Sequence, residues 1–292
     1  MIARASAPAT TANLGPGFDV LGAALGQRTV FLLQEGRGAF VWPKGVEPPA
    51  RNLFLDGFAA AFALRGAPAP SIDVEVAEMV PLQSGLGSSA AAICAGLRAA
   101  DLFLDRPLET AEALACATSL EGHPDNAAAC LLGGVTIAAG ADPALVRRLA
   151  APPLEAVVLH PGGATSTPSS RAALPAMVPR ADAVHNIGRA ALLVYAFTQG
   201  DYALLRHATR DHLHEDARLA ACPWCGAARE AAFAAGALAM PVSGSGPTML
   251  AITLPADAER VARALRDLAG GLAGARVWRL PFSDEGASAA FA

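Results

Sequence analysis

The sequence predicts an α+β protein with two layered domains. Segments with strand-like and helix-like patterns are mixed along the 292 residues but do not follow one another as repeating βα units. Hydrophobic residues make up 53% of the chain, enough for a full core. Prolines accumulate over 142–153, so we place a domain boundary there, between a first domain over 1–150 and a second over 151–292.

The first half contains apolar patterns of both kinds. Ile72, Val74 and Val76 alternate with acidic residues, which is typical of a half-buried strand. Leucine and phenylalanine recur near helical spacing over 52–64, and two alanine-rich segments that follow favour helix. We therefore expect strands over 2–7, 27–34, 72–77 and 134–139, and helices over 52–64, 88–103 and 109–120.

The second half begins with a strand after the loose connection over 142–153. Further helices and strands follow without a repeat of fixed period. The expected strands cover 154–160, 238–242, 248–253 and 275–281, and the expected helices cover 184–198, 201–216, 224–235 and 256–269.

Charge and composition exclude several classes of function. The formal net charge is −4 and only 16% of residues are charged, which argues against a polybasic nucleic-acid binder. Lys44 is the single lysine and lies in a turn-like stretch, which excludes a lysine-containing phosphate loop and a Schiff-base lysine. The first residues lack the apolar run of a signal peptide, and prolines interrupt the longest uncharged stretch. With five cysteines, an odd number, we expect a cytoplasmic protein with reduced thiols and no membrane span.

A glycine-rich loop between a predicted strand and a predicted helix is the first candidate site. Residues 81–92 read Pro-Leu-Gln-Ser-Gly-Leu-Gly-Ser-Ser-Ala-Ala-Ala. Gly85 and Gly87 allow close approach of a ligand to the backbone. Ser88 and Ser89 fall at the start of the helix, where free N–H groups and the dipole favour an anion. Without a lysine, such a loop binds phosphate through its backbone, the dipole and a metal ion; a serine-capped turn is the simpler alternative.

The same loop also matches a dinucleotide-binding fingerprint, Gly85-x-Gly87-x-x-Ala90, with Asp105 at the distance of a ribose-binding acid. That acid normally ends a second parallel strand, whereas 89–104 has the pattern of one long helix. We therefore favour a phosphate cradle and keep a dinucleotide-binding oxidoreductase as an alternative.

A second cluster of chemically active side chains occupies 121–126, with the sequence Glu-Gly-His-Pro-Asp-Asn. Glu121 is a candidate ligand for Mg²⁺, and His123 and Asn126 are candidates for orienting a hydroxyl group. A polar connection capped by Asp125 or Asn126 explains the same residues equally well.

Two further segments, taken together with these clusters, match the motifs of one family. Residues 8–19 read Pro-Ala-Thr-Thr-Ala-Asn-Leu-Gly-Pro-Gly-Phe-Asp, and residues 243–248 read Ser-Gly-Ser-Gly-Pro-Thr. The first resembles the opening motif of homoserine kinases and the second the third motif of the GHMP kinase superfamily. The loop 81–92 resembles the superfamily signature Pro-x-x-x-Gly-Leu-Gly-Ser-Ser-Ala, and 121–126 resembles the central homoserine kinase segment. The opening motif is the specific one, because mevalonate kinases and galactokinases begin differently.

The resemblance implies a two-domain GHMP kinase fold, with an N-terminal domain like domain 2 of ribosomal protein S5 and a ferredoxin-like C-terminal domain. It implies that ATP and Mg²⁺ are used to phosphorylate the side-chain hydroxyl of L-homoserine, a step towards threonine. It further implies a homodimer. Another small-molecule kinase of the superfamily is the alternative.

The resemblance also implies a role for each matching residue. Asp19 would bind the substrate ammonium group, and Arg171 and Arg218 its carboxylate, which suits the planar fork of arginine. Asn126 stands where many members have a catalytic aspartate, so we expect no strong general base and transfer of the proton to the phosphate. The residues at the reacting end are Glu121, His123 and Asn126, and the other substrate residues are Asn13 and Thr167. Ser89 and Glu121 would hold Mg²⁺, and the ATP site would comprise Asn52, Pro81, Leu82, Gln83, Ser84, Gly85, Leu86, Gly87, Ser88, Ser89, Ala90 and Ala91.

Three positions depart from the family pattern, and one motif lies outside it. Asp216 and Ala217 precede Arg218 where the family usually has Pro-Tyr, and Glu78 stands where a basic residue is common. The segment Cys-Pro-Trp-Cys over 222–225, with two histidines upstream, is also compatible with a zinc site or a redox pair.

Overall fold

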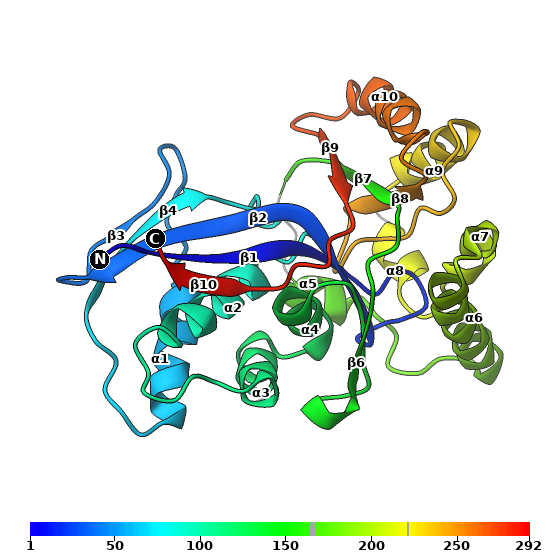
Figure 1. Cartoon of the computed structure of the whole chain (residues 1–292). Coiled ribbons are helices and arrows are strands. Elements are labelled where there is room, and N and C mark those ends of the chain that lie inside the picture. The colour runs from blue at the N-terminus through cyan, green and yellow to red at the C-terminus, as the bar shows by residue number, and fades with distance from the viewer. Residues whose placement is uncertain (164–166, 221) are drawn as a thin grey trace.

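The computed structural model describes residues 1–163, 167–220 and 222–292, without the side chains of 167–169. It contains one seven-stranded and one three-stranded sheet, each with helices packed against it (Figure 1). The prediction of a two-domain α+β fold is confirmed. No described helix has the length and apolar character needed to cross a membrane.

The larger sheet is built around two long antiparallel strands, β1 (Ala3–Ala12) and β2 (Leu21–Glu35). Their register shifts between Pro8 and Ala9, as expected where proline lacks the N–H of a regular ladder. The sheet order is β10 (Ser288–Phe291), β1, β2, β4 (Ile72–Glu78) and β3 (Phe40–Val41), with β5 (Val135–Ala138) paired to β2 and β6 (Val146–Leu149) to β5.

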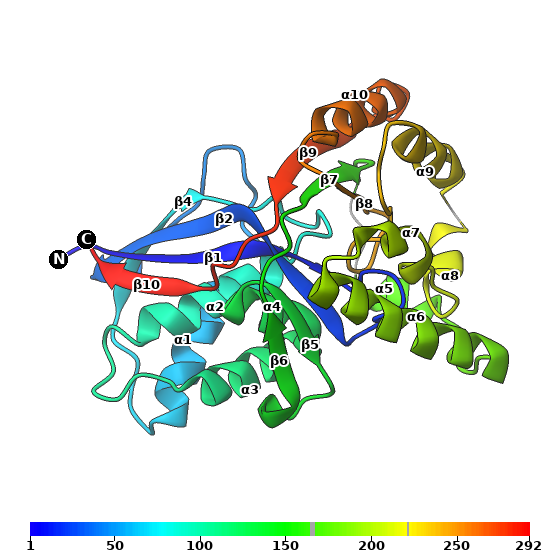
Figure 2. The same ribbon diagram turned by 45° about the vertical axis from the view of Figure 1, so that its right-hand side comes forward.

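Four helices cover one face of this sheet (Figures 1 and 2): α1 (Leu53–Leu64), α2 (Ser88–Ala100), α3 (Thr110–Glu121) and α4 (Pro124–Leu132). The contact between α1 and α2 is close because small residues face each other. A Cβ atom on Gly96 would lie 2.1 Å from the carbonyl oxygen of Phe54. Close packing of this kind, with the contacts of α2 to β1, holds the N-terminus of α2 against the sheet. The glycine-rich loop 81–92, called the phosphate loop below, includes this N-terminus.

The smaller sheet has the antiparallel order β8 (Met249–Thr253), β7 (Glu155–His160) and β9 (Arg276–Pro281). Alternate residues of β7 enter two different cores, as the two-residue period of a strand requires. Val157 and Leu159 pack with α9 (Trp224–Ala234) and α10 (Ala258–Ala269). Ala156 and Val158 share a core with α6 (Arg180–Gln199), α7 (Leu205–Ala208) and Leu25 of β2, so this core joins the two halves of the molecule.

Most expected elements are present, but three expectations are wrong. The connection over 142–153 contains a 3-10 turn, Pro143–Leu145, and strand β6, which pairs with β5. No local sequence pattern predicts this pairing. Residues 238–242 form only isolated bridges at Ala239 and Val242. The helix expected over 201–216 is interrupted: a 3-10 turn, Tyr202–Leu204, and α7 are followed by a loop before α8 (Glu215–Leu219). Asp211 causes the break by accepting the amides of residues 213–215.

Other elements were not expected. Strands β1 and β2 extend beyond the predicted ranges 2–7 and 27–34, and β3, α4 and α5 (Thr167–Ala172) were not predicted. The last strand, β10, returns to pair with β1 of the larger sheet. The two sheets change over between Leu149 and Glu155. The division into 1–150 and 151–292 stays a prediction, with β10 as a C-terminal contribution to the first sheet.

Candidate active site

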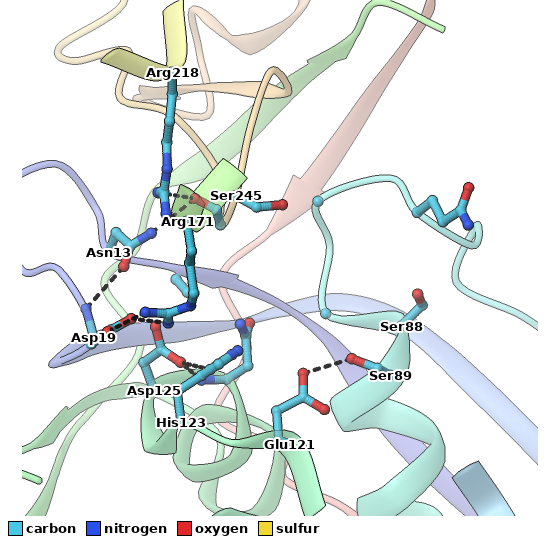
Figure 3. A pocket seen from close by; sticks show the side chains of 16 residues that line it. Asn13, Asp19, Ser88, Ser89, Glu121, His123, Asp125, Arg171, Arg218 and Ser245 are labelled. Atoms are coloured by element: carbon cyan, nitrogen blue, oxygen red, sulfur yellow. Dashed lines mark hydrogen bonds and ion pairs between the residues drawn. The ribbon is translucent and has the colours of Figure 1, made fainter. Parts of the chain in front are cut away.

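A cavity of about 230 Å³ lies where the two halves of the molecule meet. It is lined by the loop after β1, the phosphate loop, the segment 121–126, two arginines and the loop 243–248. The side chains form two groups in Figure 3: Ser88, Ser89 and Glu121 lie on one side, and Asp19 and Arg171 lie on the other. One end of the cavity therefore carries side-chain oxygen atoms, and the other end carries an ion pair.

The phosphate loop is held in a conformation that requires glycine. Gly87 caps helix α2 with a φ of 66°, in the left-handed region. A Cβ atom at this position would lie 1.9 Å from Thr10 Oγ1. The first backbone amides of α2 consequently lie at the cavity wall, with Ser88 and Ser89. The helix dipole favours a bound anion at this position.

The residues predicted for ATP binding fall into three groups. Gln83, Gly85, Gly87, Ser88 and Ser89 line the cavity. Pro81 borders a separate surface hollow, and Leu82 and Asn52 line an apolar pocket beside the cavity. The side chains of four others are buried away from the cavity: Ser84, Leu86, Ala90 and Ala91. At these four positions no side chain is available to a ligand.

The adjoining pocket has a volume of about 150 Å³ and a mostly apolar lining. Trp42, Phe54 and Met79 contribute to its walls, and it shares Gln83, Ser88 and Ser89 with the main cavity. Asn52 is the N-cap of α1, because its Oδ1 accepts the Leu55 amide at 3.2 Å. An apolar pocket next to an anion cradle suits a planar base attached to phosphates.

Glu121 is a partly buried carboxylate whose hydrogen-bond partner is neutral. Its Oε1 accepts a hydrogen bond from Ser89 Oγ at 2.6 Å, and within the described residues no basic side chain pairs with it. Burial raises the pKa of Glu121, opposed by the Ser89 hydrogen bond and the nearby His123. Among the described residues there is no cluster of three or more His, Cys, Asp and Glu that could hold a metal. A carboxylate and a hydroxyl facing a phosphate cradle nevertheless match the few protein oxygens that Mg²⁺ uses.

His123 and Asn126 lie in the cavity wall at the start of α4. His123 Nδ1 lies 2.6 Å from Asp125 Oδ1. Burial by itself lowers the pKa of His123, but the hydrogen bond and charge of Asp125, together with the charge of Glu121, outweigh it and raise that pKa. Asn126 Oδ1 accepts the Thr10 hydroxyl at 2.7 Å, which leaves the amide nitrogen as the group available to a ligand.

Asp19 and Arg171 neutralise each other across the cavity. The guanidinium donates to both carboxylate oxygens, at 2.6 and 2.8 Å, in a two-pronged ion pair (Figure 3). The Asp19 hydrogen bond raises the pKa of Arg171. Asn13 supports the pair, because its Oδ1 accepts the Asp19 amide at 3.0 Å and its Nδ2 donates to Gly244 O at 2.9 Å. The loop 13–19 is thereby connected to the loop 243–248.

Arg218 reaches the same cavity from α8, although Asp216 and Ala217 stand before it in place of the Pro-Tyr that the resemblance led us to expect. It donates from Nη1 to Gly244 O at 2.8 Å, and the same nitrogen lies 3.0 Å from His214 Nδ1. Because His214 Nε2 lies 2.8 Å from Gly15 O, the neutral ring donates there and accepts from Arg218. Burial and the nearby Arg171 lower the pKa of Arg218, and its buried Nε has no partner within the described residues. This donor is available to an anionic group.

Some predicted features lie outside this site. Glu78 is exposed at the end of β4 and lines neither pocket. Thr167 begins α5, but its side chain lies outside the described residues. Asp105 follows α2 in a bend, not at the end of a strand, so the dinucleotide fingerprint lacks its acid. Cys222 and Cys225 are free thiols, and burial raises the pKa of Cys225 to about 12.

Several site residues escaped the sequence reasoning. Thr10 and His214 contact partners from distant parts of the chain, Asn126 and Gly15, whereas Asp125 contacts its near neighbour His123. Ser243 and Thr248 bind backbone carbonyls of the phosphate loop. No sequence pattern states which hydroxyl meets which carbonyl, since more than 150 residues separate them: 158 for one pair and 164 for the other.

Comparison with known proteins explains this constellation. The family profiles described as GHMP kinases N terminal domain and GHMP kinases C terminal match residues 52–134 and 193–270. A homoserine kinase of Desulfitobacterium hafniense is 37% identical over 98% of this chain and 99% of its own length. A homoserine kinase of Streptomyces avermitilis is 42% identical over 89% of this chain and 88% of its own length.

The chain belongs to the homoserine kinase family of GHMP kinases. The crystal structure of homoserine kinase from Cytophaga hutchinsonii superposes with a TM-score of 0.87 at 30% identity, covering 99% of this chain and 97% of that one. A mevalonate kinase with a TM-score of 0.72 and 11% identity, covering 97% and 99% of the two chains, shares the fold. The resemblance seen in the four motifs is confirmed.

Proposed function

We propose that the protein transfers the γ-phosphoryl group of ATP to the side-chain hydroxyl of L-homoserine. The observation that carries this proposal is the arrangement of the cavity. A phosphate cradle with its apolar side pocket lies at one end, and acidic and basic groups matched to a zwitterionic amino acid lie at the other. Family membership supports the same reaction.

The nucleotide would occupy the cavity and the apolar pocket together. Adenine would occupy the pocket near Trp42, where the amide nitrogen of Asn52 is one of the polar groups in the lining. The phosphates would extend past Gln83 to the start of α2, with the backbone amides and the helix dipole as their partners. Ser88 is shared by both cavities and marks the point where they meet.

Ser89 and Glu121 would hold Mg²⁺ against the phosphates. Bound there, the ion would neutralise charge on the transferring phosphoryl group. The fit rests on the partly buried carboxylate of Glu121, which forms no ion pair with a basic side chain among the described residues. A bound cation would remove the desolvation penalty that raises the pKa of this carboxyl group.

The substrate would enter the existing ion pair. Asp19 would take the ammonium group of homoserine, while Arg171 and Arg218 would take its carboxylate. Each charge of Asp19 and Arg171 is satisfied in the free protein, so the binding of a zwitterion exchanges one ion pair for two. An alcohol without both charges cannot make this exchange, which is the basis for selecting an amino acid.

Among the described residues at the reacting end, we assign positioning roles and no strong base. Asn126 offers an amide nitrogen, which donates and cannot accept a proton. The raised pKa of His123 keeps its ring cationic to higher pH, where it stabilises negative charge near Glu121 and Asp125. The substrate proton would therefore pass to the transferred phosphoryl group, as loose phosphoryl-transfer transition states permit.

The test is ADP release from MgATP with L-homoserine, L-serine, L-threonine and mevalonate as separate acceptors. We expect release that depends on L-homoserine. Release with mevalonate instead would preserve the phosphate site and overturn the amino-acid clamp, pointing to another GHMP small-molecule kinase. Absence of release with all four would contradict the kinase proposal. The cytoplasmic location and the homodimer stay predictions.

A further inference from the structure

Two hydroxyl groups of the loop 243–248 bind consecutive carbonyl groups of the phosphate loop. Thr248 Oγ1 donates to Ser84 O at 2.8 Å, and Ser243 Oγ donates to Gly85 O at 2.6 Å. Both hydroxyl-bearing residues are fully buried. These contacts join the C-terminal half of the chain to the backbone that would surround the phosphates.

The next two carbonyls are also occupied. Leu86 O accepts the Thr10 amide at 3.0 Å, and Gly87 O accepts the Ala91 amide at 2.9 Å. Four successive carbonyls are thus engaged by the protein itself. By contrast, within the described residues no backbone N–H over 82–90 donates to another protein group. This difference gives the loop a polarity: its backbone carbonyl groups over 84–87 are occupied, and its backbone N–H groups over 82–90 are available to a ligand.

This polarity is what an anion site requires. A peptide unit that turned its carbonyl towards a phosphate would repel it, and the left-handed φ angles at Gly85 and Gly87 give these peptides freedom to turn. We propose that Ser243 and Thr248 are positioning residues that fix the phosphate-loop peptides with their N–H groups available to a nucleotide polyphosphate. The proposal rests on the nucleotide binding proposed above.

His160 is the third member of this arrangement. The Thr248 hydroxyl has one hydrogen, which it donates to Ser84 O, so His160 Nδ1 at 2.9 Å must donate to Thr248 Oγ1. The His160 ring stacks on Trp278 at 6.1 Å, and burial with the charge of Arg276 lowers its pKa. The Nδ1–H is present in the tautomer required here and in the cation, so protonation leaves the bond intact.

Ser243 is oriented in the same manner. Its hydroxyl hydrogen is given to Gly85 O, so the Thr11 hydroxyl, 3.0 Å away, must donate to Ser243 Oγ. Each positioning hydroxyl therefore has a donor behind it and a phosphate-loop carbonyl in front of it. The donor behind each hydroxyl fixes the direction of both hydrogen bonds.

The experiment measures the dissociation constant for MgADP by calorimetry, without homoserine, and then the KM values for ATP and homoserine. Thr248→Val keeps the shape and removes the hydroxyl, and we expect about tenfold weaker MgADP binding, the loss of one buried hydrogen bond. Thr248→Ser keeps the donor and should bind like the wild type. Thr253→Val is the matched control, because Thr253 is equally buried but donates to Leu254 O in the smaller sheet.

His160 gives an independent pair of variants. His160→Asn retains a donor near the position of Nδ1 and should preserve MgADP affinity. His160→Leu removes the donor and should weaken MgADP binding and raise the KM for ATP, with the KM for homoserine unchanged. A merely structural role would move both KM values, or would lower the melting temperature without this selectivity.

Three results would overturn the inference. One is wild-type MgADP affinity in a folded Thr248→Val or Ser243→Ala protein. If Thr248→Val does not fold, equal MgADP affinity of His160→Leu and His160→Asn is the second. The third is failure of the wild type to bind MgADP, which also overturns the proposed nucleotide site and is thereby distinguishable from the first two.

Discussion

Asp19 and Arg171 illustrate what a single pair of residues contributes to substrate choice. In the free protein they satisfy each other in a two-pronged contact, with about a third of each side chain exposed: 32% for Asp19 and 37% for Arg171. Solvent screening at this exposure keeps the contribution of the pair to stability small. The pair is therefore suited to exchange its partners for a ligand.

Replacing Arg171 with alanine should raise the KM for homoserine about 100-fold, the loss of two charge-assisted hydrogen bonds. The KM for ATP should stay within about twofold, since Arg171 lies at the end of the cavity away from Ser88 and Ser89 (Figure 3). Steady-state kinetics with each substrate varied in turn measures both values.

Two controls accompany this prediction. Arg171→Lys keeps the charge and loses the planar fork, so its KM should lie between those of the wild type and the alanine variant. Arg210→Ala removes an exposed arginine outside the cavity and should leave both KM values unchanged. Equal increases in the two KM values for Arg171→Ala would show that it does not clamp the substrate.

At the scale of elements, helices α8 and α9 and the approach to the loop 243–248 meet at one buried acid. Glu215 accepts the Val242 amide at 2.6 Å and pairs with Arg229 of α9. Burial raises its pKa to about 7, against the opposing charge of Arg229. Because Arg218 lies on the same short helix, Glu215 helps to position Arg218 at the cavity.

The raised pKa makes a prediction about stability. The folded state holds the Glu215 proton more tightly than the unfolded state, whose pKa is near 4.5. The favourable contribution is therefore complete below pH 4.5 and is lost as pH rises towards 7. Relative to Glu215→Gln, the wild type should lose about 3 kcal/mol of unfolding free energy over this interval.

Urea denaturation of the wild type and Glu215→Gln at several pH values measures that difference. The glutamine variant cannot titrate at this position and serves as the reference. A difference between the two proteins that stays constant from pH 4.5 to 7 would show that the pKa of Glu215 is not raised in the folded protein.

The elements predicted well are those with local causes. The periodicity over 52–64 and the alternation over 72–77 yield α1 and β4 almost residue for residue. Helix α4 had a local signal too, since Pro124 occupies the first turn, where proline is favoured. Strand β6 had none: two arginines occupy half of it, and its pairing with β5 alone makes it a strand.

At the scale of the whole molecule, the chain closes on itself. Strand β10 pairs with β1, and the Ala292 amide donates to Ile2 O at 2.9 Å, which brings the two ends of the chain together (Figures 1 and 2). The larger sheet thus depends on residues from both ends of the sequence. Its edge strand is the last element to be synthesised.

Deletion of residues 288–292 should destabilise the larger sheet selectively. We expect a loss of about 2 kcal/mol, from several backbone hydrogen bonds along Ala3–Ser6. Hydrogen exchange should show faster exchange of the β1 amides, with β8 of the smaller sheet as an internal reference. Equal acceleration in β8 would mean that the two sheets unfold as one unit.

The sequence by itself determined the family, the fold class and the chemical inventory of the cavity. The motifs at 8–19, 81–92, 121–126 and 243–248 supply glycines, hydroxyls, carboxylates and amides, and these residue types follow directly from the sequence. The tertiary structure alone decided the pairings: Asp19 with Arg171, Thr10 with Asn126, and two hydroxyls with two phosphate-loop carbonyls. Residue type and local periodicity are properties of neighbouring positions. A hydrogen bond across more than a hundred residues depends on how two sheets and their helices pack, which no local pattern encodes.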